Sequence, residues 1–362
     1  MMSSDLSITQ RLLLEMHRSI VRKAAGEHPL TQLFWECTLR CNLRCQHCGS
    51  DCGSDCKVQE LTPDMPFEDF SKALDSIAAH TDPHTVMVVI TGGEPLMRSD
   101  LEACGREIYL KGFPWGMVTN GYALTEERFQ RLRHSGLHSI TVSLDGLEED
   151  HDWMRGRPGS FGRASEAIRI IARSGITADV VTCVNARNID SLPAIREHLI
   201  SLGMKAWRLF TVFPQGRAKG NRDMQISGEQ LRRVLDFIVE TRREGRIRCD
   251  FMCEGFTGPY EGKVRDGFYT CSAGLTTASV LSDGSISACA SIRADYHQGN
   301  IYTDDFWTVW NERFQPYRDR SWMKKGECAQ CRHFRYCMGN GMHLRDENGE
   351  LIQCVYNKMY KN

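Results

Sequence analysis

Sixteen cysteines are spread through the 362 residues of the sequence, and six of them fall between Leu33 and Cys56. Within this stretch, three residues separate Cys41 from Cys45 and two separate Cys45 from Cys48. Soft thiolates at such short spacing select zinc, copper(I) or iron–sulfur clusters. Three thiolates would leave one iron of a four-iron cluster open to a substrate or cofactor, whereas a structural zinc ion needs a fourth protein ligand.

A fourth zinc ligand is available close by in the sequence, from Cys37, His47, Cys52 or Cys56. The residues alone therefore leave two alternatives open at this stretch, an iron–sulfur cluster and a zinc ion. Cys104 and Cys183 each stand alone in helix-like or strand-like runs, and we expect them to be isolated core residues.

The elements that must position these cysteines alternate between apolar strand-like runs and amphipathic helical runs from residue 31 to 245. The expected strands are Gln32–Glu36, Thr85–Thr91, Pro114–Thr119, Ser139–Leu144, Ala178–Val184 and Ala206–Val212. The expected helices are Phe67–His80, Leu101–Lys111, Glu126–Ser135, Gly162–Ser174, Leu192–Leu202 and Gly228–Glu244. Six strand–helix units predict an α/β fold with parallel strands, either a partial (β/α)6 TIM-like barrel or an open doubly wound sheet.

The residues with chemical potential follow the expected strands at their carboxyl ends. In parallel α/β folds these ends share one face, which carries the ligand site. Gly92 and Gly93 let the backbone approach a ligand closely because they have no side chain, and the Glu94 carboxylate can accept hydrogen bonds from an ammonium group. In chain order the six strand-end segments are Cys41–Cys48, Gly92–Pro95, Thr119–Gly121, Asp145-Gly146, Asn185 and Pro214–Gly216.

Composition places the chain among soluble globular proteins of about two domains, with 41% hydrophobic residues, 25% charged residues and a net charge of −1. This charge gives no electrostatic case for binding nucleic acid or a membrane. No apolar run reaches the length of a membrane span or a secretory signal, so we expect a cytoplasmic protein whose cysteines are thiols.

The chain is expected to divide into three parts. Residues 1–30 hold an amphipathic helix that packs on the body, residues 31–245 form the strand–helix repeat, and residues 246–362 form a second domain. In this last part the apolar runs are short, and Ser279–Ile286 is typical of a β-hairpin around Asp283-Gly284. We expect metal sites to hold this domain together. Seven of its cysteines are Cys253, Cys271, Cys289, Cys328, Cys331, Cys337 and Cys354.

The cysteine spacing after a first strand, followed by Gly-Gly-Glu-Pro after a second, resembles the radical S-adenosylmethionine (radical SAM) enzymes. The resemblance implies that Cys41, Cys45 and Cys48 hold a [4Fe–4S] cluster whose open iron binds SAM. The family often has an aromatic residue before the last cysteine, where this chain has His47. Cys37, Cys52 and Cys56 match no ligand position of the family, so we expect them to be bystander thiols.

The same resemblance suggests further contacts to SAM. The segment Ser143–Gly146 and the run from His151 to Phe161 are similar to those of the peptide-modifying branch. The turn Gly92-Gly93-Glu94 would meet the amino group of SAM, and Ser143 would hydrogen-bond its carboxylate. Arg155 would either add charge at that carboxylate or form a structural salt bridge. Asn185 would either lie near the adenosine or cap its loop.

The C-terminal cysteines resemble the SPASM extension of radical SAM proteins, which carries auxiliary [4Fe–4S] clusters. The resemblance makes Cys328, Cys331, Cys337 and Cys354 a complete distal set. A proximal set would have Cys271 and Cys289, joined by Cys253 or Cys249. Gly341 stands where the extension has another cysteine.

The gap at Gly341 leaves three alternatives for the auxiliary cysteines. The proximal cluster has an open iron, it has a replacement ligand, or there is only one auxiliary cluster, held by Cys271, Cys289, Cys328 and Cys331. A zinc-ribbon-like site is the alternative without a cluster.

The resemblance implies reductive cleavage of SAM to a 5′-deoxyadenosyl radical that removes hydrogen from a substrate. The expected substrate is a peptide or protein, as for a maturase, and the expected electron donor is a flavodoxin or ferredoxin. One alternative is a radical SAM enzyme acting on a small molecule such as a tetrapyrrole in cofactor biosynthesis. Another is a non-enzymatic zinc or iron–sulfur protein, which would leave the strand-end pattern unexplained.

Overall fold

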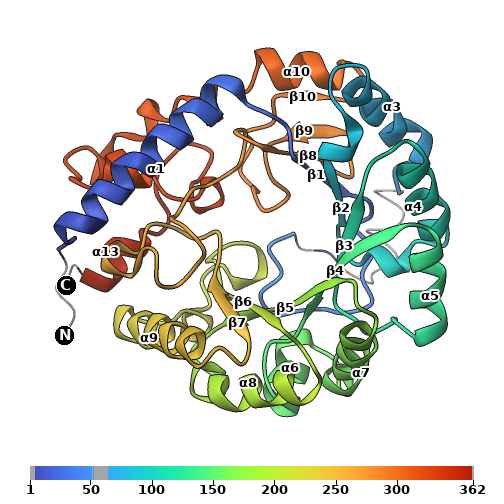
Figure 1. Ribbon diagram of the computed structural model, residues 1–362, viewed down its shortest axis with the longest axis horizontal. Coiled ribbons are helices and arrows are strands. Elements are labelled where there is room, and N and C mark those ends of the chain that lie inside the picture. The colour runs from blue at the N-terminus through green and yellow to red at the C-terminus, as the bar shows by residue number, and fades with distance from the viewer. Residues whose placement is uncertain (1–4, 51, 53–63, 361–362) are drawn as a thin grey trace.

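A single curved sheet organises the computed structural model, which describes residues 5–50, 52 and 64–360 (Figure 1). Cys56 lies outside the described residues. The strand order is β10-β9-β8-β1-β2-β3-β4-β5-β6-β7, so β10 and β7 are the two ends of the sheet. All neighbouring strands from β8 to β7 are parallel, whereas β9 and β10 are antiparallel.

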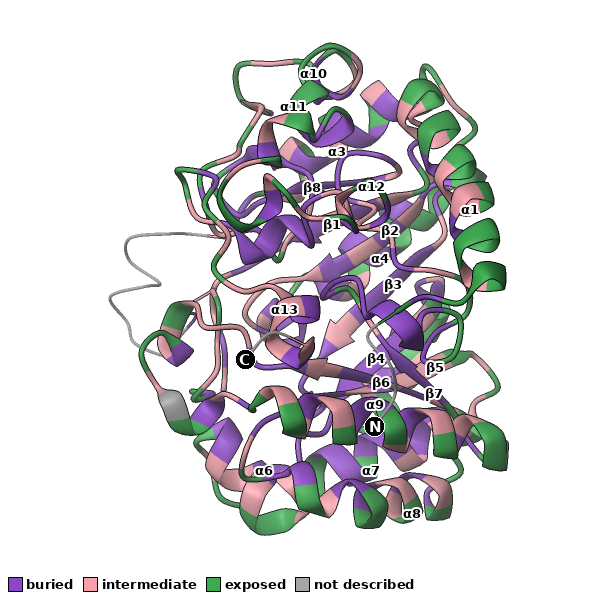
Figure 2. Ribbon diagram, turned by 90° about the vertical axis from the view of Figure 1, so that its left-hand side faces the viewer, coloured by how far each residue is buried: buried purple, intermediate pink, exposed green. Residues whose placement is uncertain are grey.

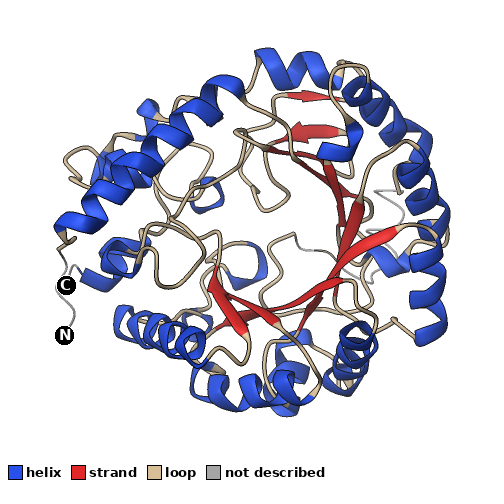
Figure 3. Ribbon diagram, in the orientation of Figure 1, coloured by secondary structure: helices blue, strands red, loops and turns tan. Residues whose placement is uncertain are grey.

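The strands are short, and helices follow most of them along the outside of the sheet (Figure 3). The strands are β1 (Gln32–Glu36), β2 (Met87–Thr91), β3 (Trp115–Thr119), β4 (Leu137–Ser143), β5 (Thr177–Val184), β6 (Ala206–Thr211), β7 (Arg248–Phe251), β8 (Thr277–Val280), β9 (Ser285–Ser287) and β10 (Gly299–Asn300). The helices of the repeat are α3 (Phe67–Ala78), α4 (Leu101–Leu110), α5 (Glu126–His134), α6 (Glu148–Arg155), α7 (Ser160–Arg173), α8 (Leu192–Ser201) and α9 (Gly228–Glu244). The others are α1 (Ile8–Glu27), α10 (Phe306–Glu312), α11 (Gln315–Arg318), α12 (Phe334–Cys337) and α13 (Val355–Tyr360).

The predicted α/β architecture of parallel strands and crossover helices is confirmed, with differences at the edges. Each of the six predicted strands and helices is present. The second strand begins at Met87 rather than Thr85, because Asp82 caps a helical turn at Pro83–Thr85. The helix α6 was not predicted, because charged residues dominate it. The strand β7 was not predicted, because four residues are too few to show an alternating pattern.

Alternation along the strands separates the helix-facing layer from the inner face of the curved sheet. Trp207 and Leu209 of β6 are fully buried, and Trp207 packs on Phe237 of α9 with 5.9 Å between ring centroids. Arg208 and Phe210 of the same strand are only half-buried. Because successive side chains of a strand point to opposite faces, Arg208 and Phe210 face the interior of the barrel.

The N-terminal helix α1 lies along the cysteine-rich part of the chain (Figure 1). Glu15 accepts a hydrogen bond from Tyr336 (2.9 Å), and His17 Nε2 lies 2.6 Å from Thr270 Oγ1. The outer side of the helix is largely exposed, as Figure 2 shows. That side includes four large apolar residues, which are Ile8, Leu12, Met16 and Ile20.

The predicted boundary at residue 245 stays a prediction, because both flanking parts share one sheet. Strand β7 follows the boundary and pairs with β6. Strand β8 begins the predicted hairpin with β9, and it also pairs in parallel with β1, where Trp35 lies opposite Val280. The cysteine-rich part therefore continues the barrel at two places rather than standing apart from it.

Candidate active site

The loop after β1 carries Cys41, Cys45 and Cys48, the first two buried and the third half-buried. The backbone N–H groups of Arg44 and Gln46, between these cysteines, donate hydrogen bonds to carbonyl oxygens in the last turn of α6. The three thiols also pack in one small apolar cluster. The path of the loop is therefore set by contacts within the protein.

Gly92 and Gly93, at the end of β2, pack against this same loop. Gly92 has a φ of +142°, and a Cβ added there would lie 2.2 Å from Thr38 O. A Cβ on Gly93 would lie 2.4 Å from Arg40 O. Gly93 N donates to Thr38 O (2.7 Å) and Glu94 N donates to Arg40 O (2.9 Å). The close approach expected toward a ligand is thus made toward the cysteine loop.

The Glu94 carboxylate is buried and has three hydrogen-bond donors from the protein. Its Oε1 accepts from Leu96 N (3.1 Å) and Thr119 Oγ1 (2.6 Å), and its Oε2 accepts from Asn120 N (2.7 Å). Burial raises the pKa of Glu94 despite these bonds, which lower it. The carboxylate joins the end of β2 to the end of β3. Recognition of an ammonium group by Glu94 stays a prediction.

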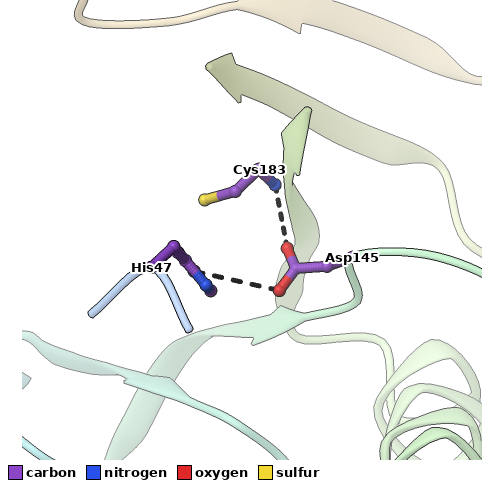
Figure 4. Close-up of side chains that lie close together, drawn as sticks. All are labelled: His47, Asp145 and Cys183. Carbon is purple, nitrogen blue, oxygen red and sulfur yellow. Dashed lines mark hydrogen bonds and ion pairs between the residues drawn. The ribbon is translucent and has the colours of Figure 1, made fainter. Parts of the chain in front are cut away.

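A buried ion pair lies beside the cysteine loop, between Asp145 at the end of β4 and Arg155 at the end of α6. Arg155 Nη2 lies 2.7 Å from Asp145 Oδ2, and Arg155 Nη1 lies 3.6 Å from Cys45 Sγ. Asp145 Oδ1 accepts from Cys183 N (2.8 Å), and Oδ2 lies 3.9 Å from His47 Nε2 (Figure 4). The pair thereby links the ends of β4 and β5 and the loop after β1 to the thiol of Cys45.

Electrostatics fix the charges of this group. Burial alone would raise the pKa of Asp145 and lower that of Arg155, but their mutual attraction reverses both shifts. Burial lowers the pKa of His47 to about 4. At neutral pH the group is therefore an aspartate–guanidinium pair beside an uncharged imidazole. The structural salt bridge expected for Arg155 is present.

Two members of this group were missed or misassigned from sequence. Cys183 was expected to be an isolated core residue, but its thiol lies within 4.8 Å of ligand atoms of His47 and Asp145. The expectation failed because the odd-numbered side chains of β5 at this end face the barrel interior rather than the helices. Asp145 was noted only as a strand-end residue, and its charge at that place was the available signal. Cys104, by contrast, is buried in α4 as expected.

Ser143 and Asn185 end neighbouring strands of the sheet. Ser143 is the last residue of β4 and is largely buried. Asn185 follows β5, and its Oδ1 accepts from the backbone N–H groups of Arg187 (2.8 Å) and Asn188 (3.2 Å). Asn185 therefore caps its loop, and its contact with an adenosine stays a prediction, as does the contact of Ser143 with a carboxylate.

The loop after β6 clamps the cysteine loop from the other side, and sequence reasoning missed this contact. Arg217 donates from Nε to Cys45 O (2.7 Å), from Nη1 to Cys52 O (2.8 Å) and from its backbone N to Cys48 O (3.0 Å). Gly216 has a φ of +54°, and a Cβ there would lie 2.3 Å from Cys48 O. The only signal was the segment Pro214–Gly216 at a strand end.

Cys52 is a fourth thiol beside Cys41, Cys45 and Cys48. It is 3% exposed and packs with Cys41 and Cys45. A hydrogen bond from Cys52 is the largest cause that lowers the pKa of Cys48 to about 5. Cys37 lies away from this group, and its backbone oxygen accepts from Arg98 Nη1 (2.8 Å). The bystander role expected for both residues stays a prediction.

Four C-terminal cysteines line one pocket of about 370 Å³ that is partly open to solvent. The pocket lies between α12, α13 and the turns around them. Burial raises the pKa of both Cys337 and Cys354. The thiol of Cys354 adds to the rise for Cys337, and the thiols of Cys328 and Cys331 add to the rise for Cys354. The four residues are those of the predicted distal set, which are Cys328, Cys331, Cys337 and Cys354.

Three other cysteines form a separate group. The pKa of Cys253 is raised to about 12, first by desolvation and then by the thiols of Cys289 and Cys271. Solvent reaches the side chain of Cys253, yet protein surrounds it deeply, so it faces an interior space. Cys249 of β7 interacts instead with Asp250. This grouping favours Cys253 over Cys249 as the neighbour of Cys271 and Cys289. Cys271 also lines a pocket together with Cys337 of the distal set, so the division into two clusters stays a prediction.

Two family models match the chain. The model described as the radical SAM superfamily matches residues 35–199, and the SPASM model, an iron–sulfur cluster-binding domain, matches residues 271–332. The chain belongs to the radical SAM superfamily. It carries a SPASM-type domain after the barrel, as the resemblance indicated. The zinc and non-enzymatic alternatives are therefore set aside.

Curated relatives of this radical SAM enzyme fall into two groups. The AdoMet-dependent heme synthase of Methanosarcina barkeri is 28% identical over 309 residues, covering 78% of this chain and 85% of the relative. The Fe-coproporphyrin III synthase of the same organism is 26% identical over 300 residues, covering 75% and 74%. The mycofactocin maturase MftC of Mycolicibacterium smegmatis is 30% identical over 269 residues, covering 70% and 65%. The relatives thus include both tetrapyrrole enzymes and a maturase.

Solved structures support the fold of the whole chain. The structure of anSMEcpe with bound AdoMet and the Cp18Cys peptide has a TM-score of 0.69 at 19% identity and covers 92% of this chain and 95% of that one. Streptococcus suis SuiB bound to S-adenosylmethionine has a TM-score of 0.67 at 17% identity, covering 92% and 79%. At this identity the similarity establishes the architecture alone.

Membership of the family determines the cofactors of the radical SAM enzyme. It uses a [4Fe–4S] cluster and SAM in the barrel, and auxiliary iron–sulfur clusters in the SPASM domain. The donors present are suited to them, because all fifteen cysteines of the described residues are free thiols. Among the described residues, no helix is long and apolar enough to cross a membrane.

Proposed function

We propose that this radical SAM enzyme acts on a small molecule of the tetrapyrrole class. The observation that carries the proposal is the set of heme and coproporphyrin enzymes whose similarity extends over most of both chains. MftC and PqqA peptide cyclase are matched over less of their own lengths, 65% and 58%. A peptide substrate, which the sequence resemblance favoured, is the second candidate because of the 30% identity to MftC.

Cys41, Cys45 and Cys48 are the proposed ligands of the cluster that binds SAM. Their loop is fastened from α6, from the end of β2 and from the loop after β6, and it offers three thiols that converge. When bound, SAM and this cluster supply a carbon-centred radical that removes a hydrogen atom from the substrate.

The polar residues around the loop are proposed to bind SAM or to position the cysteines. Arg155 positions Cys45 through its contact with the thiol and its ion pair with Asp145. Its Nε is buried without a hydrogen-bond partner among the described residues, which suits a site that receives another polar group. Gly92, Gly93, Glu94, Ser143 and Asn185 complete the proposed SAM site.

Arg208 is the residue proposed to bind a carboxylate of the substrate. Its side chain faces the barrel interior with 26% exposure, and its Nη2 donates to Thr141 Oγ1 (2.9 Å) and Asp179 Oδ1 (3.1 Å). Burial raises the pKa of Cys253, and the positive charge of Arg208 opposes that rise. A propionate held there would present its neighbouring carbon to the barrel interior.

The auxiliary cysteines are proposed to serve electron transfer. Removing hydrogen from the propionate carbon next to the ring, which is β to the carboxylate, followed by loss of CO2 from the neighbouring carbon, gives a vinyl group and leaves one electron. A nearby iron–sulfur cluster can accept that electron. A flavodoxin or ferredoxin as reductant and a cytoplasmic location belong to the same proposal.

Anaerobic reconstitution tests both the enzyme class and the substrate. Dithionite-reduced protein with SAM is offered either iron coproporphyrin III or a set of cysteine-containing peptides. The measurements are 5′-deoxyadenosine release and the substrate mass. We expect loss of CO2 and two hydrogens from the tetrapyrrole, with 5′-deoxyadenosine formed in proportion.

Cys41→Ala and Cys104→Ala provide the matched pair, since both remove a buried thiol but only Cys41 belongs to the cysteine loop. Cys41→Ala should abolish 5′-deoxyadenosine release and Cys104→Ala should keep it. Peptide modification without a change in the porphyrin would replace the tetrapyrrole assignment. Equal activity in Cys41→Ala would contradict the whole site.

A further inference from the structure

The side chain of His343 fills the place where the SPASM extension has a cysteine and this chain has Gly341. A Cβ added to Gly341 would lie 2.6 Å from His343 Cε1 and 2.9 Å from Nδ1. The same point is 3.1 Å from Cys253 O. No side chain larger than that of glycine fits position 341 unless the imidazole moves. The glycine and the histidine therefore form a matched pair of positions.

His343 is fixed in this place and lacks one expected contact. The residue is 6% exposed, its ring centroid lies 4.3 Å from that of Phe213, and its carbonyl oxygen accepts from Gln215 Nε2 (2.7 Å). Its Nε2 is buried without a hydrogen-bond partner among the residues that the structure describes. A buried polar atom left without a partner is costly, because it has lost its bonds to water and gained none, so a ligand for this nitrogen is physically expected.

Cys253 is held in a backbone conformation that cysteine rarely adopts. Its φ is 52°, in the left-handed region, where the Cβ of a non-glycine residue crowds the following carbonyl oxygen. The residue lies two positions after the end of β7, and its carbonyl oxygen and the ring of His343 both lie close to the point that a Cβ on Gly341 would occupy. After burial, Cys289 and Cys271 raise the pKa of its thiol. Such strain persists where the surrounding structure requires one side-chain direction.

We propose that the proximal auxiliary cluster is held by the thiolates of Cys253, Cys271 and Cys289 and by the imidazole of His343 through Nε2. The replacement ligand thus closes the cluster, and no iron stays open for a substrate. The proposal is independent of the substrate, so failure of the tetrapyrrole assignment leaves it unaffected.

The proposed ligand set assigns the proximal cluster to electron transfer. A neutral imidazole in place of a thiolate removes one negative charge from the cluster environment. Histidine ligation raises the reduction potential of iron–sulfur centres compared with ligation by cysteine alone. We therefore expect the proximal cluster to be reduced before the distal one, whose four donors are all thiolates.

Pulsed EPR on protein with ¹⁵N-labelled histidine tests the proposal directly. The measurement uses the Cys41→Ala, Cys45→Ala, Cys48→Ala triple variant, in which only auxiliary clusters contribute. Partial reduction should give a signal with strong coupling to a histidine nitrogen. His343→Cys should keep the iron content, about eight atoms per chain for two clusters, and lose this coupling.

Two further variants keep the test decisive. His333→Gln changes a histidine that lines the distal pocket and should leave the coupling unchanged. Gly341→Cys combined with His343→Ala restores a thiol at position 341, and it should hold the iron without nitrogen coupling if His343→Cys does not fold. Absence of histidine coupling in the parent protein, or its survival in His343→Cys, would overturn the proposal. Free imidazole should not change the EPR signal of the triple cysteine variant. A change would show that an auxiliary cluster has an open iron, and it would overturn the proposal as well.

Discussion

The cysteine loop of the barrel and the cysteine-rich segment after residue 320 use thiols in two structurally different settings. The loop is fastened by hydrogen bonds from the ends of β2, α6 and β6. The described residues from 321 to 360 contain only short helical turns, the longest of which is α13 with six residues. We therefore expect the barrel to hold the shape of its cysteine loop without iron, and the C-terminal segment to depend more on its clusters for order.

Iron removal should produce the largest difference between the two regions. Metal binding contributes on the order of 10 kcal/mol to the folding of small metal domains, and such domains unfold without their metal. Anaerobic chelation should therefore abolish amide-exchange protection in residues 321–360 and preserve it in β1 to β6. Hydrogen–deuterium exchange with mass spectrometry measures both in one sample. Uniform loss, or uniform retention, would show that the two regions do not differ in this way.

The buried ion pair of the barrel should be the next most sensitive point. Arg155→Gln leaves the Asp145 carboxylate buried and unpaired, which typically costs about 3–5 kcal/mol. Asp145→Asn in the same chain should restore most of the lost free energy of unfolding, because the charge is removed with its partner. Urea unfolding of the iron-free parent, single variant and double variant measures these free energies.

The restored double variant separates stability from function. It should still bind SAM poorly, because the contact between Arg155 and Cys45 is absent. Full recovery of SAM binding, measured by isothermal titration of reconstituted protein, would mean that the pair has only a structural role.

Backbone fit at the barrel loop predicts a smaller effect. Gly92→Ala places a Cβ 2.2 Å from Thr38 O at a φ of +142°, and we expect a loss of about 3 kcal/mol in unfolding free energy. Gly162→Ala in α7 is the matched control, because a Cβ there meets no atom within 4 Å. That change should stabilise by about 0.5–1 kcal/mol. A small loss in Gly92→Ala would mean that the loop adapts and is not preformed.

The order of strands and helices in the barrel could be predicted from the sequence, because each of these elements has its own local periodicity. The six predicted strands lie where the apolar runs are, and their carboxyl ends share one side. Strand β7 was missed because four residues cannot establish a period. The parallel pairing of β8 with β1 joins residues more than 240 positions apart, and no local pattern encodes it.

Residues of the candidate site could be predicted from the sequence only where they stand at a fixed spacing along the chain. Cys41, Cys45 and Cys48 stand on one loop, so their spacing, together with the family resemblance, was enough to predict them as a ligand set. The contacts of Arg217 with that loop, and the position of Cys183 beside Asp145, depend on how separate strand-end loops converge. The position of His343 beside Gly341, on which the proposed replacement of a thiol rests, was equally hidden, because it depends on the direction of one side chain.

The helical layer of the barrel should add a small pH dependence to the stability through His198. His198 of α8 lies 2.9 Å from Ser165 Oγ and stacks on Phe161, and burial, followed by the charge of Arg169, lowers its pKa below 6.5. Below pH 6.5 the unfolded chain therefore binds more protons at this histidine than the folded chain does. The contribution of His198 to the free energy of unfolding is complete above pH 6.5 and is lost as the pH falls toward its folded-state pKa.

His198→Gln should remove this acid-side loss of stability, and His134→Gln, at an exposed position of α5, should retain it. Urea midpoints at several pH values below 7 measure the effect, which should be smaller than that of Gly92→Ala. Because α8 packs on the barrel rather than on the cysteines, the difference between the two variants should persist after iron is removed. Its disappearance in the iron-free protein would show that the barrel itself depends on the clusters, contrary to the contrast between the two regions.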